Sequence, residues 1–276
     1  MMKDFLNKKA EEVSKDFQSK RCKRVSKPHL TLVPENLARH LVFANNWMLR
    51  SDHASVMMDK PNDIALYSNI ATSNLKDAMQ IYEQKLFPNK RITLVSLQPN
   101  EHAIFYDYFE KITVSIIFAY SSIETLANIF IPFDFKIKKK EKSGVVKIWN
   151  KEAIERTYTL RDKLKVVLTN VLKTSEPEKE KWWVLFIELE EIRNELIHVK
   201  PSKSEERFSK LLTKKIFTII ETHQEIISYY GHYIEDMKSD SINKFPYGFK
   251  NDKVAFSTMS EKNYIEKWKR LLNIPK

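Results

Sequence analysis

The sequence predicts an all-α fold, and three observations support this prediction. Apolar residues recur at spacings of three and four along most of the 276 residues, as in helices that pack along one face. Glycine occurs only three times, at Gly144, Gly231 and Gly248, which excludes the glycine-rich turns of P-loops and dinucleotide-binding folds. Residues 91–97, RITLVSL, have strand-like composition but no obvious pairing partner, so we expect an extended connector there.

The first 98 residues are expected to form an additional N-terminal helical part. Residues 3–25 have the pattern of a charged amphipathic helix, and a break follows at 28–34. Proline opens each of the next two expected helices, over residues 34–59 and 61–87. The second of these helices is expected to direct the following side chains into the core: Ala65, Ile70, Leu75, Met79 and Tyr82.

The longest predicted helix covers residues 99–131. Its polar residues Tyr120, Glu124 and Asn128 recur every four positions and form a polar stripe on an otherwise apolar helix. The apolar run at 112–133 is long enough to cross a membrane, but the polar residues within it favour a buried bundle helix. The expected packing seam consists of Ile112, Ile116, Ala119, Ile123, Leu126 and Phe130.

The rest of the chain is expected to continue the bundle and to end in a cap. A lysine-rich loop at 132–144 and an extended segment at 145–150 precede helices predicted over 151–174, 182–200 and 205–237, a turn at 243–252 and a last helix at 260–272. Two apolar sets are expected to point inward: Tyr158, Leu160, Leu164, Val167 and Leu168, and then Phe208, Leu211, Leu212, Ile216, Ile219 and Ile220. We therefore predict an N-terminal helical region over 1–98, a helical bundle over 99–238, and a C-terminal turn and capping helix over 239–276.

The helix over 182–200 combines strong periodicity with residues that can carry chemistry. Arg193 falls between two apolar stripes, so we expect it to be half-buried and to need an anion. Asn194 and His198 are one turn apart and share the polar face. Pro201 disfavours helix at the preceding residue, which places His198 in or just past the last turn.

Each of these residues also has a purely structural interpretation. Glu124 is the expected partner of Arg193, either to hold the cation at a site or only to lock two helices together. An isolated histidine near a helix end, such as His198, is usually a capping or surface residue. The other histidines have no such context, and we expect them to be structural or exposed.

The string RNELIH at residues 193–198 resembles the R-x(4–6)-H signature of HEPN domains. The segments AYSSIETLAN at 119–128 and ERTYTLRDKLKVVL at 155–168 resemble the preceding helices of bacterial HEPN proteins. The resemblance covers about residues 99–237, roughly half of the chain. It implies an HEPN-like helical bundle over 99–238 with an additional N-terminal helical part.

HEPN ribonucleases are dimers with a composite site, so the resemblance implies a homodimeric, metal-independent endoribonuclease that acts on RNA. His198 would be the general base or acid, Arg193 would clamp the scissile phosphate, and Asn194 would orient the phosphate or the imidazole. The polar stripe would support Arg193. The products would carry a 2′,3′-cyclic phosphate and a 5′-hydroxyl. Stand-alone HEPN nucleases are commonly toxins or abortive-infection effectors, which implies restraint of growth during phage attack.

Two other functions also fit the sequence. A catalytically inactive HEPN-like bundle could bind RNA or a protein as a scaffold, although a scaffold has no need of Arg193, Asn194 and His198. A helical sensor or regulatory subunit, held silent by a second protein, fits as well. Cleavage of RNA in the presence of EDTA, lost in His198→Ala, separates the enzyme from both.

Composition limits the remaining choices. Forty-seven Lys and Arg against 36 Asp and Glu give a net charge of +11, with lysines clustered at 20–27 and 136–142. This fits a polyanionic partner and a merely solvated lysine-rich surface equally well. The single Cys22 and the lack of an apolar leader lead us to expect a cytoplasmic protein without membrane association. Because HExxH and CxxC motifs are absent, we expect no metal and no other cofactor.

Overall fold

The computed structural model describes residues 22–27, 29–32, 40–43, 46–88, 97–99, 101–140, 146–234, 244–246, 249 and 255–258. The chain is mostly helical, which confirms the predicted all-α class. It divides into two compact units, residues 63–230 and residues 1–62 together with 231–276. The first boundary lies at residue 62, whereas the sequence suggested residue 98.

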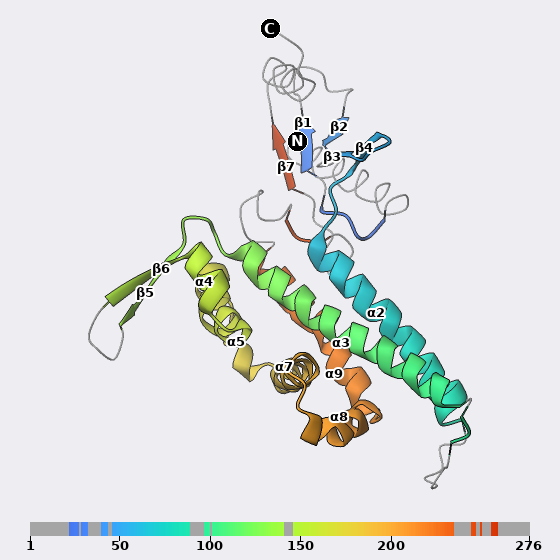
Figure 1. The fold of residues 1–276 in the computed structure, drawn as a ribbon. Coiled ribbons are helices and arrows are strands. Elements are labelled where there is room, and N and C mark those ends of the chain that lie inside the picture. Colours follow the sequence, from blue (N-terminus) through green and yellow to red (C-terminus); the bar gives the residue numbers. More distant parts are fainter. Residues whose placement is uncertain are drawn as a thin grey trace. The chain divides into compact units, whose positions relative to one another are not determined.

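Two long helices pack together in the unit over 63–230. α2 (Asp63–Ile81) continues into a π-helical turn, η2 (Tyr82–Leu86), and α3 (His102–Phe130) runs antiparallel beside it (Figure 1). The Ser115 hydroxyl donates to the carbonyl of Ala71 at 2.7 Å, so a small polar side chain joins the two helices at a close approach. The whole predicted seam of α3 is buried, and of the predicted face of α2 only Ile70 and Met79 are partly exposed.

Among the described residues, α3 is the one helix long and apolar enough to cross a membrane. Half of its most apolar stretch is buried inside the structure. Its seam packs against α2 and the other helices of the unit, as in the core helix of a bundle.

Two antiparallel strands occupy residues 136–140 and 146–150, where the sequence predicted a lysine-rich loop up to residue 144 and an extended segment after it. β5 (Lys136–Lys140) pairs antiparallel with β6 (Val146–Asn150), and Ile137 lies opposite Trp149. Both side chains pack on the buried cluster of Ile131, Ile154 and Val167. The loop prediction was wrong for residues 136–140, because Phe135 and Ile137 flank a lysine and both pack on this cluster, as in a strand with one packed face.

The single helix predicted over 151–174 is interrupted after its second turn. α4 (Lys151–Thr157) ends before Thr159, whose hydroxyl accepts a hydrogen bond from the amide of Asp162 at 3.1 Å. Thr159 thereby caps a new start, and α5 (Leu160–Asp162), the π-helical η3 (Lys163–Leu168) and α6 (Thr169–Leu172) follow. The helix stops at Lys173, which adopts a left-handed conformation with φ of 55°.

The remaining helices of this unit carry the candidate site. A 3₁₀ turn, η4 (Pro177–Lys179), precedes α7 (Trp182–Ile197), and η5 (Pro201–Lys203) leads into α8 (Ser204–Leu211). The helical structure is interrupted at residues 212–214, and α9 (Lys215–Ile234) begins after them, so the prediction of one helix over 205–237 was wrong. The Tyr108 hydroxyl donates to the carbonyl of Leu211 at 2.6 Å and satisfies a terminal acceptor at this break. Phe208, an expected core anchor, is partly exposed and packs on Phe109.

His223 in α9 is fully buried, as expected for a structural histidine. Its Nε2 lies 2.9 Å from the hydroxyl of Ser68 in α2, and its Nδ1 lies 2.6 Å from the carbonyl of Ile220. Burial lowers the pKa of His223 from 6.5 to about 4, although both hydrogen bonds oppose the shift. The imidazole is therefore a neutral link between α2 and α9 at neutral pH.

The other unit contains strands where a helix was predicted over 34–59. β1 (His29–Leu32) pairs antiparallel with β2 (His40–Phe43) and parallel with β7 (Ala255–Thr258). β3 (Asn46–Arg50) and β4 (Ser55–Asp59) form a hairpin. Its turn is closed by Ser51, whose hydroxyl accepts from the amides of His53 and Ala54 at 3.3 and 3.1 Å. This local side-chain bond favours a turn over a continuous helix.

Several predicted segments lie wholly or largely outside the described residues. They are the helix over 3–25, the connector at 91–97, the turn at 243–252 and the helix at 260–272.

Candidate functional site

The C-terminal end of α7 presents the predicted site residues. Trp182, Phe186, Leu189 and Ile192 bury one face of the helix, which fixes its rotation in the bundle. His198 follows the last helical residue, and its amide donates to the carbonyl of Asn194 at 2.8 Å. The predicted position just past the final turn is therefore confirmed. Asn194 and His198 are both exposed.

Arg193 is half-buried, as predicted, but its partner differs from the one expected. Its guanidinium lies 4.7 Å from the ring centroid of Tyr120 and donates to the Asn194 side-chain oxygen at 3.0 Å. The expected ion pair with Glu124 is absent among the described residues. The face of an aromatic ring takes the place of a carboxylate because it too attracts a cation.

The acid at the centre of this region is Glu190, which the sequence reading did not single out. It is buried and accepts a hydrogen bond from the Tyr120 hydroxyl at 3.2 Å. Its other carboxylate oxygen accepts from the side chain of Arg161. Burial raises the pKa of Tyr120, and the charges of Glu190 and Glu124 raise it further. Arg193 thus rests on a tyrosine that Glu190 holds in place.

Asn128, the third member of the polar stripe, contacts a different cation. Lys163 donates to the Asn128 side-chain oxygen and to the carbonyl of Glu155, both at 2.9 Å. Burial lowers the pKa of Lys163, and the charges of Glu124 and Glu155 oppose this effect. The stripe therefore serves two networks, one below Arg193 and one around Lys163. Lysine within the apolar pattern of residues 160–168 was the signal that could have revealed the second network.

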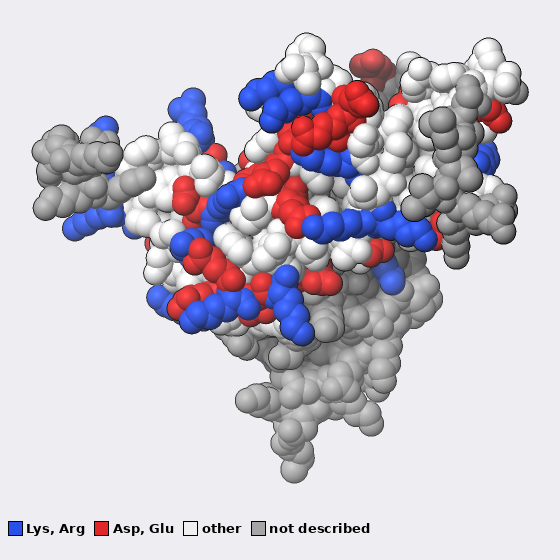
Figure 2. Space-filling model, turned by 90° about the horizontal axis from the view of Figure 1, so that it is seen from below, with Lys and Arg blue, Asp and Glu red and all other residues white. Residues whose placement is uncertain are grey.

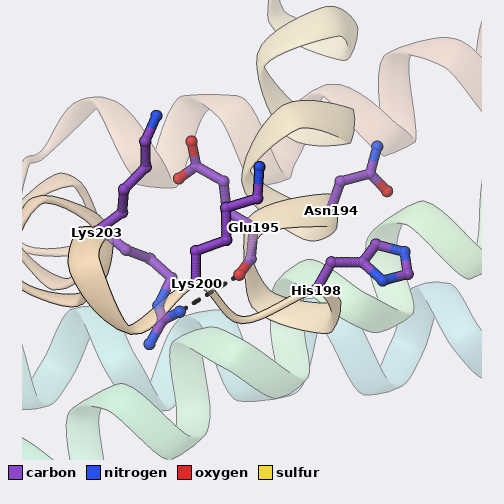
Figure 3. A pocket seen from close by; sticks show the side chains of 6 residues that line it. Asn194, Glu195, His198, Lys200 and Lys203 are labelled. Atoms are coloured by element: carbon purple, nitrogen blue, oxygen red, sulfur yellow. Dashed lines mark hydrogen bonds between the residues drawn. The ribbon is translucent and has the colours of Figure 1, made fainter.

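A pocket of about 230 Å³ opens beside the end of α7. Figure 3 shows Asn194 and His198 pointing in the same direction, whereas Lys200 and Lys203 extend on another side. The residues that line the pocket are Asn194, Glu195, His198, Lys200, Lys203 and Arg207. The structure thus brings two of the predicted site residues to one pocket, whereas Arg193 lies outside its lining and is linked to it by the hydrogen bond to Asn194.

The pocket provides groups for proton transfer and for binding an anion. The imidazole of His198 is a group that can accept or donate a proton, and three cationic side chains lie around the same space. Glu124 and Asn128 lie outside its lining. Within the described part of the chain, no group of three or more His, Cys, Asp or Glu side chains is arranged to hold a metal ion.

The surrounding surface carries both signs of charge. Acidic and basic side chains are interleaved across the face seen in Figure 2 and do not form a uniform basic patch. Ion pairs explain this pattern, for example between Lys165 and Glu178 at 2.6 Å and between Lys215 and Glu188 at 2.7 Å. Cationic groups without an acidic partner therefore matter more for binding an anion than the net charge does.

Comparison with known proteins adds no relative. No family model, no curated protein and no solved structure matches the chain.

Proposed function

We propose that this protein is a metal-independent endoribonuclease of the HEPN-like type, in which His198, Asn194 and Arg193 act on the RNA backbone. The observation that carries the proposal is the shared pocket: His198 and Asn194 both line it, and Arg193 is hydrogen-bonded to Asn194 at 3.0 Å. A ligand phosphate in this pocket would meet an imidazole, an amide and cationic side chains together.

The proposed reaction is a transesterification within the RNA. The 2′-oxygen attacks the adjacent phosphorus, its proton passes to a base, and the bond from phosphorus to the 5′-oxygen breaks as an acid protonates that oxygen. His198 is the proposed base or acid, and Arg193 stabilises the negative charge of the crowded phosphorus. The products are a 2′,3′-cyclic phosphate and a 5′-hydroxyl, and DNA is resistant because it lacks the 2′-hydroxyl.

Among the described residues of one chain, His198 is the one imidazole that lines the pocket, whereas the reaction uses both a base and an acid. A two-fold dimer that pairs α7 with its copy would supply a second His198 and a second Arg193. The homodimer therefore belongs to the proposal, and its expected mass in solution is twice the 32.7 kDa of one chain.

The test is RNA cleavage in EDTA by the purified full chain. Wild type should cleave total RNA and leave cyclic phosphate ends, and His198→Ala should be slower by about 10²- to 10⁴-fold, the usual contribution of a general acid or base. His102→Ala is the matched control, because His102 is exposed at the start of α3, away from the pocket lining. Equal cleavage by wild type and His198→Ala would refute the assignment.

The second candidate function is a catalytically inactive scaffold for RNA or a protein partner. It is favoured by one observation: the His198 ring forms no hydrogen bond with a described residue that would orient it for proton transfer. Binding of RNA with no cleavage by either protein would support this candidate. Arrested growth of cells that express wild type, but not His198→Ala, would support a toxin or anti-phage effector.

A further inference from the structure

The most unusual group in the pocket is Arg207 in α8. Only 8% of the surface of this residue is exposed, yet its guanidinium forms a single hydrogen bond with the described residues, from Nη1 to the carbonyl of Glu195 at a long 3.4 Å. Its buried Nε has no acceptor among the described residues. The ring of Phe208 lies 5.0 Å from the guanidinium carbon and offers a face but no acceptor. A guanidinium has five N–H donors, so most of its hydrogen-bonding capacity is unused.

The balance of charge in the pocket is positive. Glu195 is the one acid in the lining, and its carboxylate accepts from Lys210, which approaches from outside the lining at 3.0 and 3.3 Å. Lys200 and Lys203 form no ion pair with a described residue. Elsewhere on this unit, lysines such as Lys165 and Lys215 are paired with acids. The pocket therefore has an excess of cationic groups, and a buried cation is costly without an anion.

The size and neighbours of the pocket indicate which anion fits. A water molecule occupies about 30 Å³ in the liquid, so a volume of about 230 Å³ has room for a phosphate group with part of its sugar. The planar fork of an arginine suits the oxygens of a phosphate. His198 and Asn194 line the same space, so an anion held by Arg207 lies next to the proposed reacting group.

We propose that Arg207, Lys200 and Lys203 form a subsite for a phosphate of the RNA chain that is not cleaved, beside the phosphate at His198. This inference rests on the proposed function and makes it more specific: the substrate is recognised through its backbone over more than one nucleotide. Asn194 lines the pocket together with His198, and its side-chain oxygen accepts a hydrogen bond from Arg193. Such backbone contacts position RNA without reading its sequence.

The test measures binding apart from cleavage. A fluorescent 2′-O-methyl RNA oligonucleotide cannot be cleaved by the proposed reaction, and its affinity for the full chain is measured by anisotropy over a range of salt concentrations. The test variant is Lys200→Gln with Lys203→Gln. The charge-matched control is Lys173→Gln with Lys181→Gln, because both lysines are exposed and lie outside the pocket lining. Lys181 directly precedes α7, whose 16 residues span about 24 Å.

The test variant should bind the oligonucleotide about tenfold more weakly than wild type, and the control should bind as wild type does. The slope of log affinity against log salt should fall by about 1.4, or about 0.7 for each lost phosphate contact. Arg207→Lys keeps the charge but loses the fork, and it should also bind about tenfold more weakly. Thermal unfolding of each variant checks that the fold is intact. If Arg207→Lys fails to fold, the lysine pair still decides the question.

Cleavage of ordinary RNA, measured in parallel, separates this inference from the proposed function. The lysine variant should raise KM with little change in kcat. Cleavage by wild type with unchanged affinity in the lysine variant would overturn the subsite and leave the nuclease standing. Lysine-dependent binding without cleavage would support the subsite and overturn the nuclease. Stabilisation by orthophosphate alone, with RNA affinity unchanged by the lysine substitutions, would overturn the assignment to RNA.

Discussion

Acidification is expected to weaken this protein through one buried imidazole, that of His223. Burial holds its pKa at about 4, below the ordinary value of 6.5. Because the folded-state pKa is the lower one, the unfolded chain takes up a proton first as the pH falls. The contribution of neutral His223 to the stability of the folded state is thus fully present above about pH 6.5, and it is lost progressively as the pH drops toward about 4. The difference between the two pKa values corresponds to about 3 kcal/mol of unfolding free energy.

Urea unfolding of wild type and His223→Gln, followed by tryptophan fluorescence, measures this effect. Glutamine can still bond to Ser68 in α2 but does not titrate, and the carboxylates that also titrate at low pH are common to both proteins. Between pH 7 and pH 4.5, wild type should lose about 2–3 kcal/mol more than the variant. Parallel pH profiles of the two proteins would refute the reasoning, since His223 would then be protonated equally in the folded and unfolded states.

Two substitutions test other parts of the structure. Glu190→Gln removes the negative charge that Arg161 contacts. Because the Arg161 side chain is 40% exposed, solvent weakens this ion pair, and we expect the free energy of unfolding in urea to fall by only about 1–2 kcal/mol. The control Glu191→Gln, at an exposed position, should change it very little. An equal effect of both substitutions would contradict the central place of Glu190. Gly231→Ala would bring a Cβ within 2.7 Å of the Phe245 ring. Alanine favours the helix by about 1 kcal/mol, but the clash outweighs this gain, so we expect the free energy of unfolding to fall by about 1–2 kcal/mol. This loss, measured by thermal unfolding, should shrink in a Phe245→Leu background, and a loss of the same size there would rule out the steric cause.

Helices with long periodic seams could be predicted from the sequence because helical periodicity is local. The α3 seam from Ile112 to Phe130 is buried throughout, and Pro201 correctly placed His198 just past the last turn of α7, although the helix ends at Ile197 and not at residue 200. The breaks inside predicted helices depend on single side chains. Thr159 restarts the helix after α4, and Tyr108 bonds to the chain where α8 ends. Such contacts do not alter the spacing of apolar residues, so this spacing cannot predict where the helices break.

The hairpins β3–β4 and β5–β6 pair locally and were still missed, whereas the pairing of β1 with β7 could not be predicted because it is not local. β1 pairs with β7 from the far end of the sequence, and no short window contains both. At the site, the half-burial of Arg193 followed from its angular position on the helix. Its partner did not, because an aromatic face and a carboxylate can both satisfy a guanidinium. Glu190 and Arg207 lie on helical faces whose neighbours appear only when several helices pack together.

The bond from Tyr108 to Leu211 restricts the movement of α8 at its C-terminal end. It ties the end of α8 to the longest helix of the bundle, so the segment that carries Arg207 is anchored at its far end. α8 is also joined to α7, through residues 198–203 and through the bonds of Arg207 and Lys210 to Glu195. Bonds at both ends therefore hold the helix that carries Arg207, whereas the exposed Lys200 and Lys203 can adjust to a bound molecule by rotating their side chains.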